Sequence, residues 1–566
     1  MRFTNSLLRI VVSLSAPLAL TACFGSSEEA AAPPPPPPTA VGDVMTSEEA
    51  SRFLSQSTFG PGEADIDALV AMGASAWLQA EFAKPQESIL QDVLIAEAAG
   101  EDIGPDALSE AFWTRAIESD DQLRQRVGYA LSQIFVSSFA DAQLAERPVA
   151  MANYMDIMSA GAFGNYRQTL ENVTYSPAMA IFLTYLQNQK ADAVREVVPD
   201  ENYAREVMQL FTIGLLELEP DGALRLDGGG EPIETYDNVD VTELAKVFTG
   251  LSWASRNRFL GNPDRLESEY LPLVMFDSEH SPAAKSFLGA TIPANTPGDQ
   301  SISIALDVLF NHPNTAPFIS RQLIQRLVTS NPSRAYVGRV ADAFRTGSFT
   351  LPNGADAGGG GRGDMRAVVA AILLDAEARD VARIDDPTFG KLREPVLRFT
   401  HWARAFGVDD TDADDISILA NTSTPARLNQ QAYRSPSVFN FYRPGFVAPG
   451  TETADAGLVA PEFQITTGSS ITGYANFMAS FIFQDVSDEN YLPDYSAEIA
   501  LANDPAALVD RLDRILTYGS LRPEARTKII DAVSAIQGTN QYPRDETRVA
   551  MAVQMVMTST DYITQR

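Results

Sequence analysis

The sequence predicts a mainly α-helical protein, an irregular multi-helix assembly with long loops rich in glycine and proline. Apolar residues recur every three to four positions over most of the chain after residue 46, and the alternation typical of strands is scarce. Two stretches, 215–239 and 430–475, interrupt this pattern with Gly, Asp, Pro and Ser. Loops of that length in a compact protein usually serve a function or move.

The first 22 residues have the features of an export signal. Two arginines precede an apolar run at residues 10–20, and small residues follow before Cys23, which is the only cysteine of 566 residues. A cysteine placed first after the cut resembles a bacterial lipoprotein signal, in which this residue carries the lipid. A plain secretory signal with an incidental cysteine is the alternative. We therefore expect a signal peptide at 1–22 and lipidation at Cys23.

The net charge of the chain limits the classes of partner that we expect it to bind. The formal net charge is −32, and loss of the two arginines of the signal peptide changes it to −34. A surface this acidic repels nucleic-acid phosphates, so nucleic acid is not an expected partner. Later apolar runs are shorter than the ~18–20 residues that span a bilayer. We expect the lipid to be the membrane attachment, and Phe24 rather than Asp after Cys23 indicates an outer-membrane lipoprotein of the bacterial envelope.

A spacer separates the lipid from the folded body. Residues 23–45 include six consecutive prolines, Pro33–Pro38, which favour an extended conformation and prevent a packed core. The body at 46–566 is longer than one hydrophobic core normally supports. We expect it to fold without the tether and to contain two or three subdomains.

Helical periodicity defines the elements of the body. A capping signal at Thr46-Ser47-Glu48-Glu49 starts the first helix, and Gly73 is expected to separate two short helices within 63–83. Further helices are expected at 106–118, 121–138, 149–158, 165–188, 201–214, 240–250, 301–310, 315–329, 335–346, 364–378, 389–406, 506–517, 522–536 and 545–559.

Some helix starts have named capping residues. Asp240 and Glu243 form the expected capping pair of the helix at 240–250, and Asp364 is expected to cap the helix that follows the glycine-rich loop at 358–363. The helix at 201–214 separates its residues by polarity: at about 100° per residue, one face collects five polar side chains and the other is apolar.

The polar face of this helix is the predicted binding site. It consists of Glu201, Asn202, Arg205, Glu206 and Gln209. Such segregation is typical of a solvated surface, which is one interpretation. A solvated surface needs charge but not this particular combination of acids, amides and a guanidinium. We therefore expect another element or a ligand to cover these residues.

The three histidines supply the candidates for metal binding and acid–base chemistry. His280 follows Asp277 and Glu279 in a cluster that offers oxygen and nitrogen ligands to a divalent metal, and His312 is a second candidate ligand. No H-x-x-x-H or H-E-x-x-H spacing occurs in the sequence. His280, His312 and Glu206 are the candidate catalytic residues, although a structural role for His312, next to a helix start, is the alternative.

We expect two regions that are rich in aromatic residues to pack against the core. His401 lies among phenylalanine and tryptophan residues in a predicted helix and is expected to be a packing residue. The loop at 439–446 places aromatic rings among polar residues, a pattern that suits either polymer stacking or a loop fixed to the core by its rings; we favour the second.

Seven strings of the body, in the same order, resemble a large bacterial family called domain of unknown function 1800. These are Ser51–Pro61, Glu201–Gly214, Leu244–Trp253, Lys285–Gly289 after His280, Asn311–Ala316, Lys391–Pro395 and Ser435–Tyr442. The resemblance implies a secreted bacterial protein, often encoded near a second exported family that is similar to sulfatases and phosphatases. It suggests a sulfatase-like partner but identifies no catalytic residues in this chain.

Two functions fit these observations. The first is a lipid-anchored envelope protein that binds or helps assemble an extracellular polymer or a partner protein. The alternative is a metal-assisted hydrolase that acts on an envelope or extracellular substrate through His280, His312 and nearby carboxylates, which requires these residues to converge in one cleft. The sequence has no nucleophile elbow, phosphate loop or dinucleotide fingerprint. It does not decide whether the protein is an enzyme.

Overall fold

The computed structural model describes residues 42–101, 103–254, 258–410, 419–483, 491–539 and 543–566. Within them, twenty-five α-helices dominate, and eight strands of two or three residues form four antiparallel pairs. The protein is mainly α, as the periodicity predicts. Cys23 and the signal peptide lie outside the described residues and stay predictions. Contacts group Ala40–Arg566 into one compact unit, and the two or three subdomains within the body stay a prediction.

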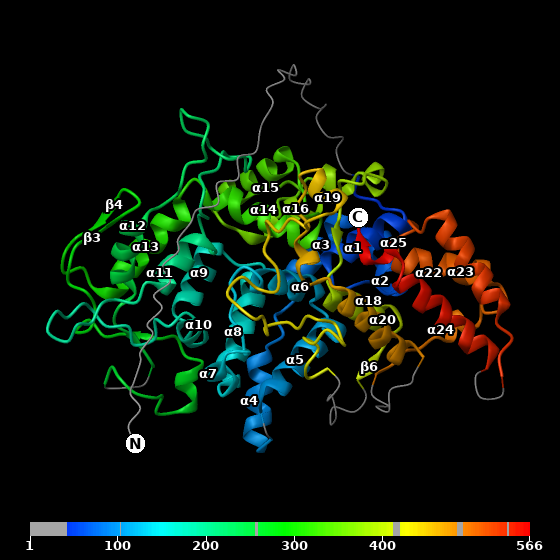
Figure 1. The fold of residues 1–566 in the computed structure, drawn as a ribbon, viewed down its shortest axis with the longest axis horizontal. Helices are drawn as coiled ribbons and strands as arrows, with labels where there is room; N and C mark the ends of the chain where they lie inside the picture. The colour runs from blue at the N-terminus through cyan, green and yellow to red at the C-terminus, as the bar shows by residue number, and fades with distance from the viewer. Residues whose placement is uncertain (1–41, 102, 255–257, 411–418, 484–490, 540–542) are drawn as a thin grey trace, which may run out of the picture. The chain divides into compact units, whose positions relative to one another are not determined.

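The first half of the body contains helices α1 to α13 and long loops between several of them (Figure 1). Its helices are α1 (Ser47–Ser57), α2 (Glu63–Met72), α3 (Ala74–Ala83), α4 (Ile89–Ala99), α5 (Pro105–Glu118), α6 (Gln122–Ser132), α7 (Ala142–Ala145), α8 (Pro148–Gly161), α9 (Tyr166–Thr174), α10 (Pro177–Phe182), α11 (Asn202–Gln209), α12 (Asn238–Ala245) and α13 (Gly298–Asn311). Helix α8 packs against α4, α6 and α9, and α11 packs against α12.

The second half continues in the same way. Its helices are α14 (Thr315–Leu327), α15 (Arg334–Thr346), α16 (Met365–Leu373), α17 (Ala376–Arg379), α18 (Pro395–Ala405), α19 (Glu452–Asp455), α20 (Gly468–Ile482), α21 (Ser496–Ile499), α22 (Pro505–Leu516), α23 (Pro523–Ala535), α24 (Arg544–Met557) and α25 (Thr560–Ile563). Helices α22, α23 and α24 pack together, and α15 packs against α14 and α16 (Figure 1). In the described residues, no helix combines the length and the apolar composition that a membrane span requires.

Short 3-10 helices and strands connect these helices. The 3-10 helices are η1 (Lys246–Phe248), η2 (Leu266–Glu269), η3 (Val381–Ile384) and η4 (Pro461–Ile465). The strand pairs are β1 (Leu251–Ser252) with β2 (Val274–Met275), β3 (Lys285–Phe287) with β4 (Ala290–Ile292), β5 (Lys391–Leu392) with β8 (Thr564–Gln565), and β6 (Asp409–Asp410) with β7 (Tyr491–Leu492).

The last residues of the chain pack against its first helix. Arg52 of α1 is 3% exposed, and its Nε donates a 2.8 Å hydrogen bond to the carbonyl oxygen of Arg566. Its Nη1 donates to the carbonyl oxygen of Asp380, which precedes η3. The pairing of β8 with β5 fixes the same terminal segment to the middle of the chain. One continuous core therefore includes residues from both ends of the body.

Several predicted helix ends are confirmed. Thr46 and Glu49 form the reciprocal capping box of α1. Gly73 has φ of 83° and separates α2 from α3. Asp364 accepts a hydrogen bond from the backbone N–H of Arg366 and caps α16. In each case the signal lies within four residues of the helix end, where side chains compete directly for the unpaired backbone groups.

Other boundaries differ from the expectation. The helix expected at 165–188 is two helices, because Pro177 has no N–H to donate and starts α10 as its first residue. The helix expected at 240–250 starts earlier, at Asn238, because Asp237 is its cap and pairs with Asp240 in a capping box, a role we had given to Asp240 and Glu243. Helices α4 and α20 were not expected at all.

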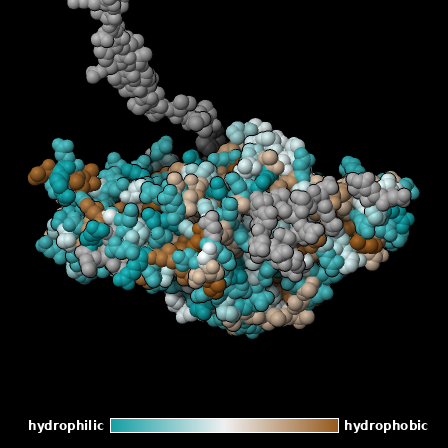
Figure 2. All heavy atoms as spheres, turned by 90° about the horizontal axis from the view of Figure 1, so that it is seen from below, coloured by the Kyte–Doolittle hydropathy of each residue, from teal (hydrophilic) through white to brown (hydrophobic). Residues whose placement is uncertain are grey.

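The face of the molecule in Figure 2 is mostly hydrophilic, and its hydrophobic residues form small, separate areas. This agrees with a chain whose formal net charge is −32.

Candidate functional site

Helix α11 carries the predicted binding residues, and part of their face is open to water. Arg205 Nη2 lies 3.6 Å from Glu201 Oε2, and the two side chains are 40% and 42% exposed. Asn202 and Gln209 are half-buried. The expectation that this face is covered is therefore wrong for the Glu201–Arg205 pair. The two residues form a solvated ion pair across one turn of the helix. Glu201 Oε1 also accepts a hydrogen bond from Thr242 of α12.

Glu206 is the shielded member of the set. It is 7% exposed, and its Oε2 has no hydrogen-bond partner among the described residues. Burial raises the pKa of the Glu206 carboxyl, and the charge of Arg205 opposes that shift. Tyr236 lies nearby with an unpartnered hydroxyl, and burial raises the pKa of Tyr236 to about 12. The charge of Glu206 adds to burial in raising the pKa of this half-buried phenol.

His280 is buried and both of its ring nitrogens are used. Nδ1 lies 2.8 Å from the carbonyl oxygen of Thr249, which only accepts, so Nδ1 carries the proton. Nε2 lies 3.2 Å from Ser301 Oγ near the start of α13. Burial lowers the pKa of His280. Asp277 accepts a 2.8 Å hydrogen bond from Gly298 N at the first residue of α13, so this loop fixes the start of that helix.

His312 lies at the other end of the same helix. It is the C-terminal capping residue of α13, and its Nδ1 accepts a hydrogen bond from Asn314 N. Burial lowers the pKa of His312. At roughly 1.5 Å per residue, about 16 Å of helix separates it from Ser301, the contact of His280. The two histidines do not share a cleft.

The predicted metal ligands therefore do not assemble. Across the described ranges, no group of three or more His, Cys, Asp or Glu side chains is placed to hold a metal ion. Asp277, Glu279 and His280 are neighbours in sequence, but Asp277 and His280 are already engaged by backbone and hydroxyl partners. His401 is a core residue, as expected: it is 2% exposed and stacks on Tyr562 at 5.7 Å.

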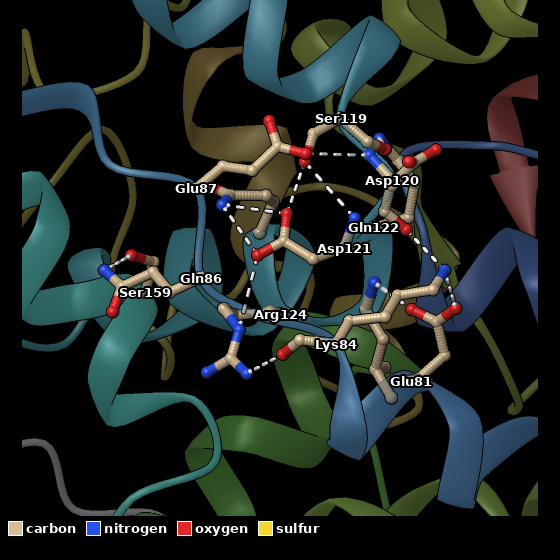
Figure 3. A network of polar contacts seen from close by, with 12 residues as sticks. Glu81, Lys84, Gln86, Glu87, Ser119, Asp120, Asp121, Gln122, Arg124 and Ser159 are labelled. Atoms are coloured by element: carbon tan, nitrogen blue, oxygen red, sulfur yellow. Dashed lines mark hydrogen bonds and ion pairs between the residues drawn. The ribbon is translucent and has the colours of Figure 1, made fainter. Parts of the chain in front are cut away.

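A polar network that the sequence did not reveal fixes the start of α6 (Figure 3). Arg124 Nη2 donates to the carbonyl oxygen of Lys84, and its Nε lies 3.3 Å from Asp121 Oδ2. Glu81 accepts from the backbone N–H of Leu123. Burial raises the pKa of Asp121 and of Glu81. These groups join α3, α5 and α6 to one another, and the adjacent internal space of about 10 Å³ admits no more than a water molecule.

A second network lies in the core and is centred on Glu394. Tyr129 of α6, Gln133 at the C-terminal cap of α6 and Gln430 of the long loop all donate to Glu394 Oε2, at 3.0, 2.6 and 2.7 Å. Burial alone would raise the pKa of Glu394, but the charges of Lys391 and of a nearby arginine outweigh it and lower that pKa.

Cations complete the core network. Lys391 Nζ lies 3.0 Å from Glu462 Oε1 and 3.6 Å from Glu394 Oε1. Arg126 Nη2 donates to the carbonyl oxygen of Arg326 at 2.7 Å, and Arg326 Nη2 donates to that of Gln133. All of these side chains are buried. The network connects the loop after residue 430 to α6 and α14.

Only some of the aromatic residues at 439–446 are buried against the core. Tyr442 is 4% exposed and lies beside Glu394, whose charge adds to burial in raising the pKa of Tyr442. Phe439, Phe441 and Phe446 are half-buried. Packing against the core, the interpretation that we favoured, therefore holds for Tyr442.

A larger cavity than the one beside α6 lies between α8, α9 and the segment from η2 to β2. It is a pocket of about 700 Å³. Helix α8 contributes Asn153, α9 contributes Glu171 and Asn172, and the rest of the polar lining comes from Tyr175, Ser176, Tyr270 and Asp299. Proline, leucine, isoleucine, valine and methionine side chains supply the apolar lining. This mixture is typical of ligand sites.

The break before Pro177 creates one wall of this pocket. Helix α9 ends at Thr174, and the turn that follows places Tyr175 and Ser176 at the pocket. The carbonyl oxygen of Tyr175 accepts a 2.8 Å hydrogen bond from Leu273 N, which holds the opposite wall in place. That wall is continuous with β2, which pairs with β1.

Further contacts hold the two walls together. Arg147, which precedes α8, donates a 2.7 Å hydrogen bond to Glu269 at the end of η2. Arg167 of α9 donates to Glu171 Oε2 and to Asp307 Oδ1, both at 2.7 Å, and thereby joins α9 to α13. The pocket is thus built on helices whose positions several ionic contacts determine.

Two groups in the pocket have specific chemistry. The Tyr175 hydroxyl donates a 2.7 Å hydrogen bond to Asp299 Oδ1 in the first turn of α13, and burial together with this bond raises the pKa of Tyr175. Ser176 is 2% exposed and its Oγ has no hydrogen-bond partner among the described residues. A buried hydroxyl without a partner costs free energy.

Sequence reasoning missed this pocket. Its residues span 153–299, and no pair of them stands out by spacing. The available local signal is the Tyr175-Ser176-Pro177 sequence, because proline ends a helix and exposes the residues before it. Two of the segments that resemble the family, Lys391–Pro395 and Ser435–Tyr442, lie in the buried core network around Glu394 and not at the pocket.

Comparison with known proteins identifies a family for this chain. No curated protein and no solved structure matches the chain. A family described as "Protein of unknown function (DUF1800)" matches residues 52–564, which is nearly the whole described body. The chain therefore belongs to this family of proteins of unknown function.

Proposed function

We propose that this protein is a lipid-anchored component of the bacterial cell envelope that binds an extracellular polymer in the pocket between α8 and α9. The anchor is Cys23, and the proline-rich tether holds the body away from the membrane. The observation that carries the binding proposal is the pocket itself, with its volume of about 700 Å³ and its polar groups directed to one space.

The lining suits a hydroxyl-rich chain such as a polysaccharide. Tyr175 and Tyr270 offer ring faces to the C–H faces of sugar rings. Asn153 and Asn172 offer amide donors and acceptors to hydroxyl groups. Apolar surface next to a few placed polar groups provides affinity and orientation together.

The alternative, a metal-assisted hydrolase, has no comparable support. Its two histidines lie at opposite ends of α13, and both are engaged in structural hydrogen bonds. The exported sulfatase-like partner that the resemblance suggests is part of the proposal only as a protein that acts on the same polymer.

Binding is tested with the full chain, purified in detergent, against a panel of insoluble polysaccharides of neutral, cationic and anionic type. We expect retention on at least one of them. Val274 lines the pocket and is 37% exposed, so Val274→Trp should obstruct the pocket and abolish retention. Val381 is 56% exposed in η3, away from the pocket, and Val381→Trp is the matched control. Retention that survives Val274→Trp, or no retention on any polymer, refutes the proposal.

The anchor has its own test. Cys23→Ala should leave an unprocessed precursor in the inner membrane, because lipid attachment precedes cleavage in the lipoprotein route that the signal resembles. Metabolic labelling with a fatty acid, followed by fractionation of the two membranes, measures both properties. Equal labelling and processing of the variant and the natural chain would refute the anchor.

A further inference from the structure

We propose that the polymer bound in this pocket carries free amino groups, so that the preferred ligand is a cationic hexosamine polymer rather than a neutral or acidic one. This inference rests on the proposed binding function and deepens it, because it names the class of ligand that the pocket selects.

The charges of the pocket have one sign. Glu171 and Asp299 are part of the lining, whereas Lys, Arg and His are absent from the described residues that line it. An acidic sugar would place its carboxylate near two others, of which only Glu171 contacts a cation, Arg167, so that its binding costs free energy. A ligand ammonium would instead be attracted by both carboxylates.

Neither carboxylate has a cation of its own to neutralise it. Arg167 donates to Glu171, but it donates equally closely to Asp307, so that one guanidinium serves two carboxylates. Asp299 accepts its 2.7 Å hydrogen bond from a neutral phenol, that of Tyr175. The pair therefore keeps a net negative charge that a cationic ligand is able to neutralise.

The remaining groups fit a hexosamine unit around its amine. The ring faces of Tyr175 and Tyr270 attract an adjacent ammonium as well as sugar C–H groups. Asn153 and Asn172 remain for the hydroxyl groups.

The charge of the whole chain acts in the same direction. With a formal net charge of −32, the protein attracts a polycation over a range set by the Debye length, which is longer at low salt. This long-range attraction is not selective, so the experiment must separate it from the local contribution of Asp299.

The test compares glucosamine and N-acetylglucosamine hexamers, which share the same backbone and differ in their charge, and adds a galacturonic acid hexamer as the anionic ligand. Binding to the full chain in detergent is measured by calorimetry at 50 mM and 300 mM salt. We expect the glucosamine hexamer to bind at least tenfold more tightly than the acetylated one at low salt, with a smaller ratio at high salt, and no binding of the anionic hexamer.

Two variants locate the selectivity. Asp299→Asn keeps the shape of the pocket and the hydrogen bond from Tyr175, and it should remove most of the preference for the amine while leaving binding of the acetylated hexamer within about twofold. Asp531→Asn removes the same charge from an exposed position on α23 and should leave the tenfold preference intact.

The outcomes separate this inference from the proposed function. Equal binding of the acetylated and deacetylated hexamers, lost in Val274→Trp, overturns the inference and retains the proposed function. Equal loss of preference in Asp299→Asn and Asp531→Asn also overturns the inference, because the preference then comes from total charge. Failure of all three hexamers and of the polymer panel overturns both.

Discussion

Lys391 Nζ lies 3.0 Å from Glu462 Oε1, and the side chains of both residues are almost completely removed from water. Lys391 also lies 3.6 Å from Glu394 Oε1, so that one ammonium stands between two buried carboxylates. These three residues come from β5, the start of α18 and η4, which are separated by up to 71 positions in the sequence, from 391 to 462. The arrangement holds the long loop after residue 430 against the core.

Lys391→Met should therefore destabilise the protein strongly. The substitution leaves Glu394 and Glu462 buried without their shared cation, for which about 3–5 kcal/mol of unfolding free energy is the expected loss. Urea unfolding followed by circular dichroism measures it. Lys528→Met, at an exposed position on α23, is the control and should change stability by less than about 0.5 kcal/mol. A loss at position 391 as small as that of the control would show that the network is not a stabilising element.

Two arginines with similar exposure should differ in their contribution to stability. The side chains of Arg205 and Arg339 are 40% and 39% exposed, but Glu201 is 42% exposed whereas Asp375 is only 4% exposed. Arg205→Ala should cost less than about 1 kcal/mol, because Glu201 is solvated when its partner is removed. Arg339→Ala should cost about 1–3 kcal/mol, because it removes two hydrogen bonds of 2.7 and 2.8 Å from a buried carboxylate. Equal losses in thermal unfolding would contradict this assignment.

Glu206 should make stability depend on pH. Because burial raises its pKa in the folded state, the native protein binds this proton more tightly than the unfolded chain does. The stabilisation is fully present below the unfolded pKa, near pH 4.5, and is lost as the pH rises through the folded pKa. Each unit of pKa difference corresponds to about 1.4 kcal/mol.

Glu206→Gln removes this dependence, so the variant should be more stable than the natural chain at pH 7.5 and equal to it near pH 4. Unfolding by urea at both pH values, with Glu201→Gln as the exposed control, measures the difference. A change in stability of the same size at both pH values would show that the buried carboxyl does not titrate differently in the folded state.

Two glycines of the loop between α15 and α16 should respond differently to alanine. A Cβ atom at Gly347 would lie 1.9 Å from the carbonyl oxygen of Gly361, and Gly347 has φ of 65°. Gly347→Ala should therefore cost at least about 1–3 kcal/mol through strain and a backbone shift. A Cβ atom at Gly361 meets nothing within 4 Å, so Gly361→Ala should be nearly neutral. Similar melting temperatures for the two variants would contradict the close approach of these backbone segments.

The sequence predicted what depends on neighbours along the chain. The helical class, the capping box at Thr46, the break at Gly73 and the cap at Asp364 all follow from interactions within one helical turn. The helix break at Pro177 could have been predicted in the same way, but the apolar pattern on both sides of this proline suggested one continuous helix. The start of α12 at Asp237 differs by one turn from the expected cap, because several acidic residues there compete for the same role.

The candidate site depends on distant residues and was not predicted. Tyr175 and Asp299 are 124 positions apart, and nothing in the spacing of either shows that they share a hydrogen bond. The polar face of α11 stood out in the sequence, yet exposure leaves Glu201 and Arg205 as an ordinary solvated pair. Polarity along one helix reveals which residues share a side, but only the packing of other helices decides which of them water reaches.

The bonds from Arg52 to the carbonyl oxygens of Asp380 and Arg566 have a consequence for the order of folding. Helix α1 is among the first parts of the body to be synthesised, yet its buried guanidinium obtains the carbonyl oxygen of Arg566 as a partner only when the last residues have arrived. Until then, the Arg52 guanidinium and the apolar side of α1 lack part of their native contacts. Contacts this distant in sequence slow folding and prolong the time during which a chain is prone to aggregation. We therefore expect the body to gain its native structure late and in one cooperative step, with a need for a holding chaperone while the chain is incomplete.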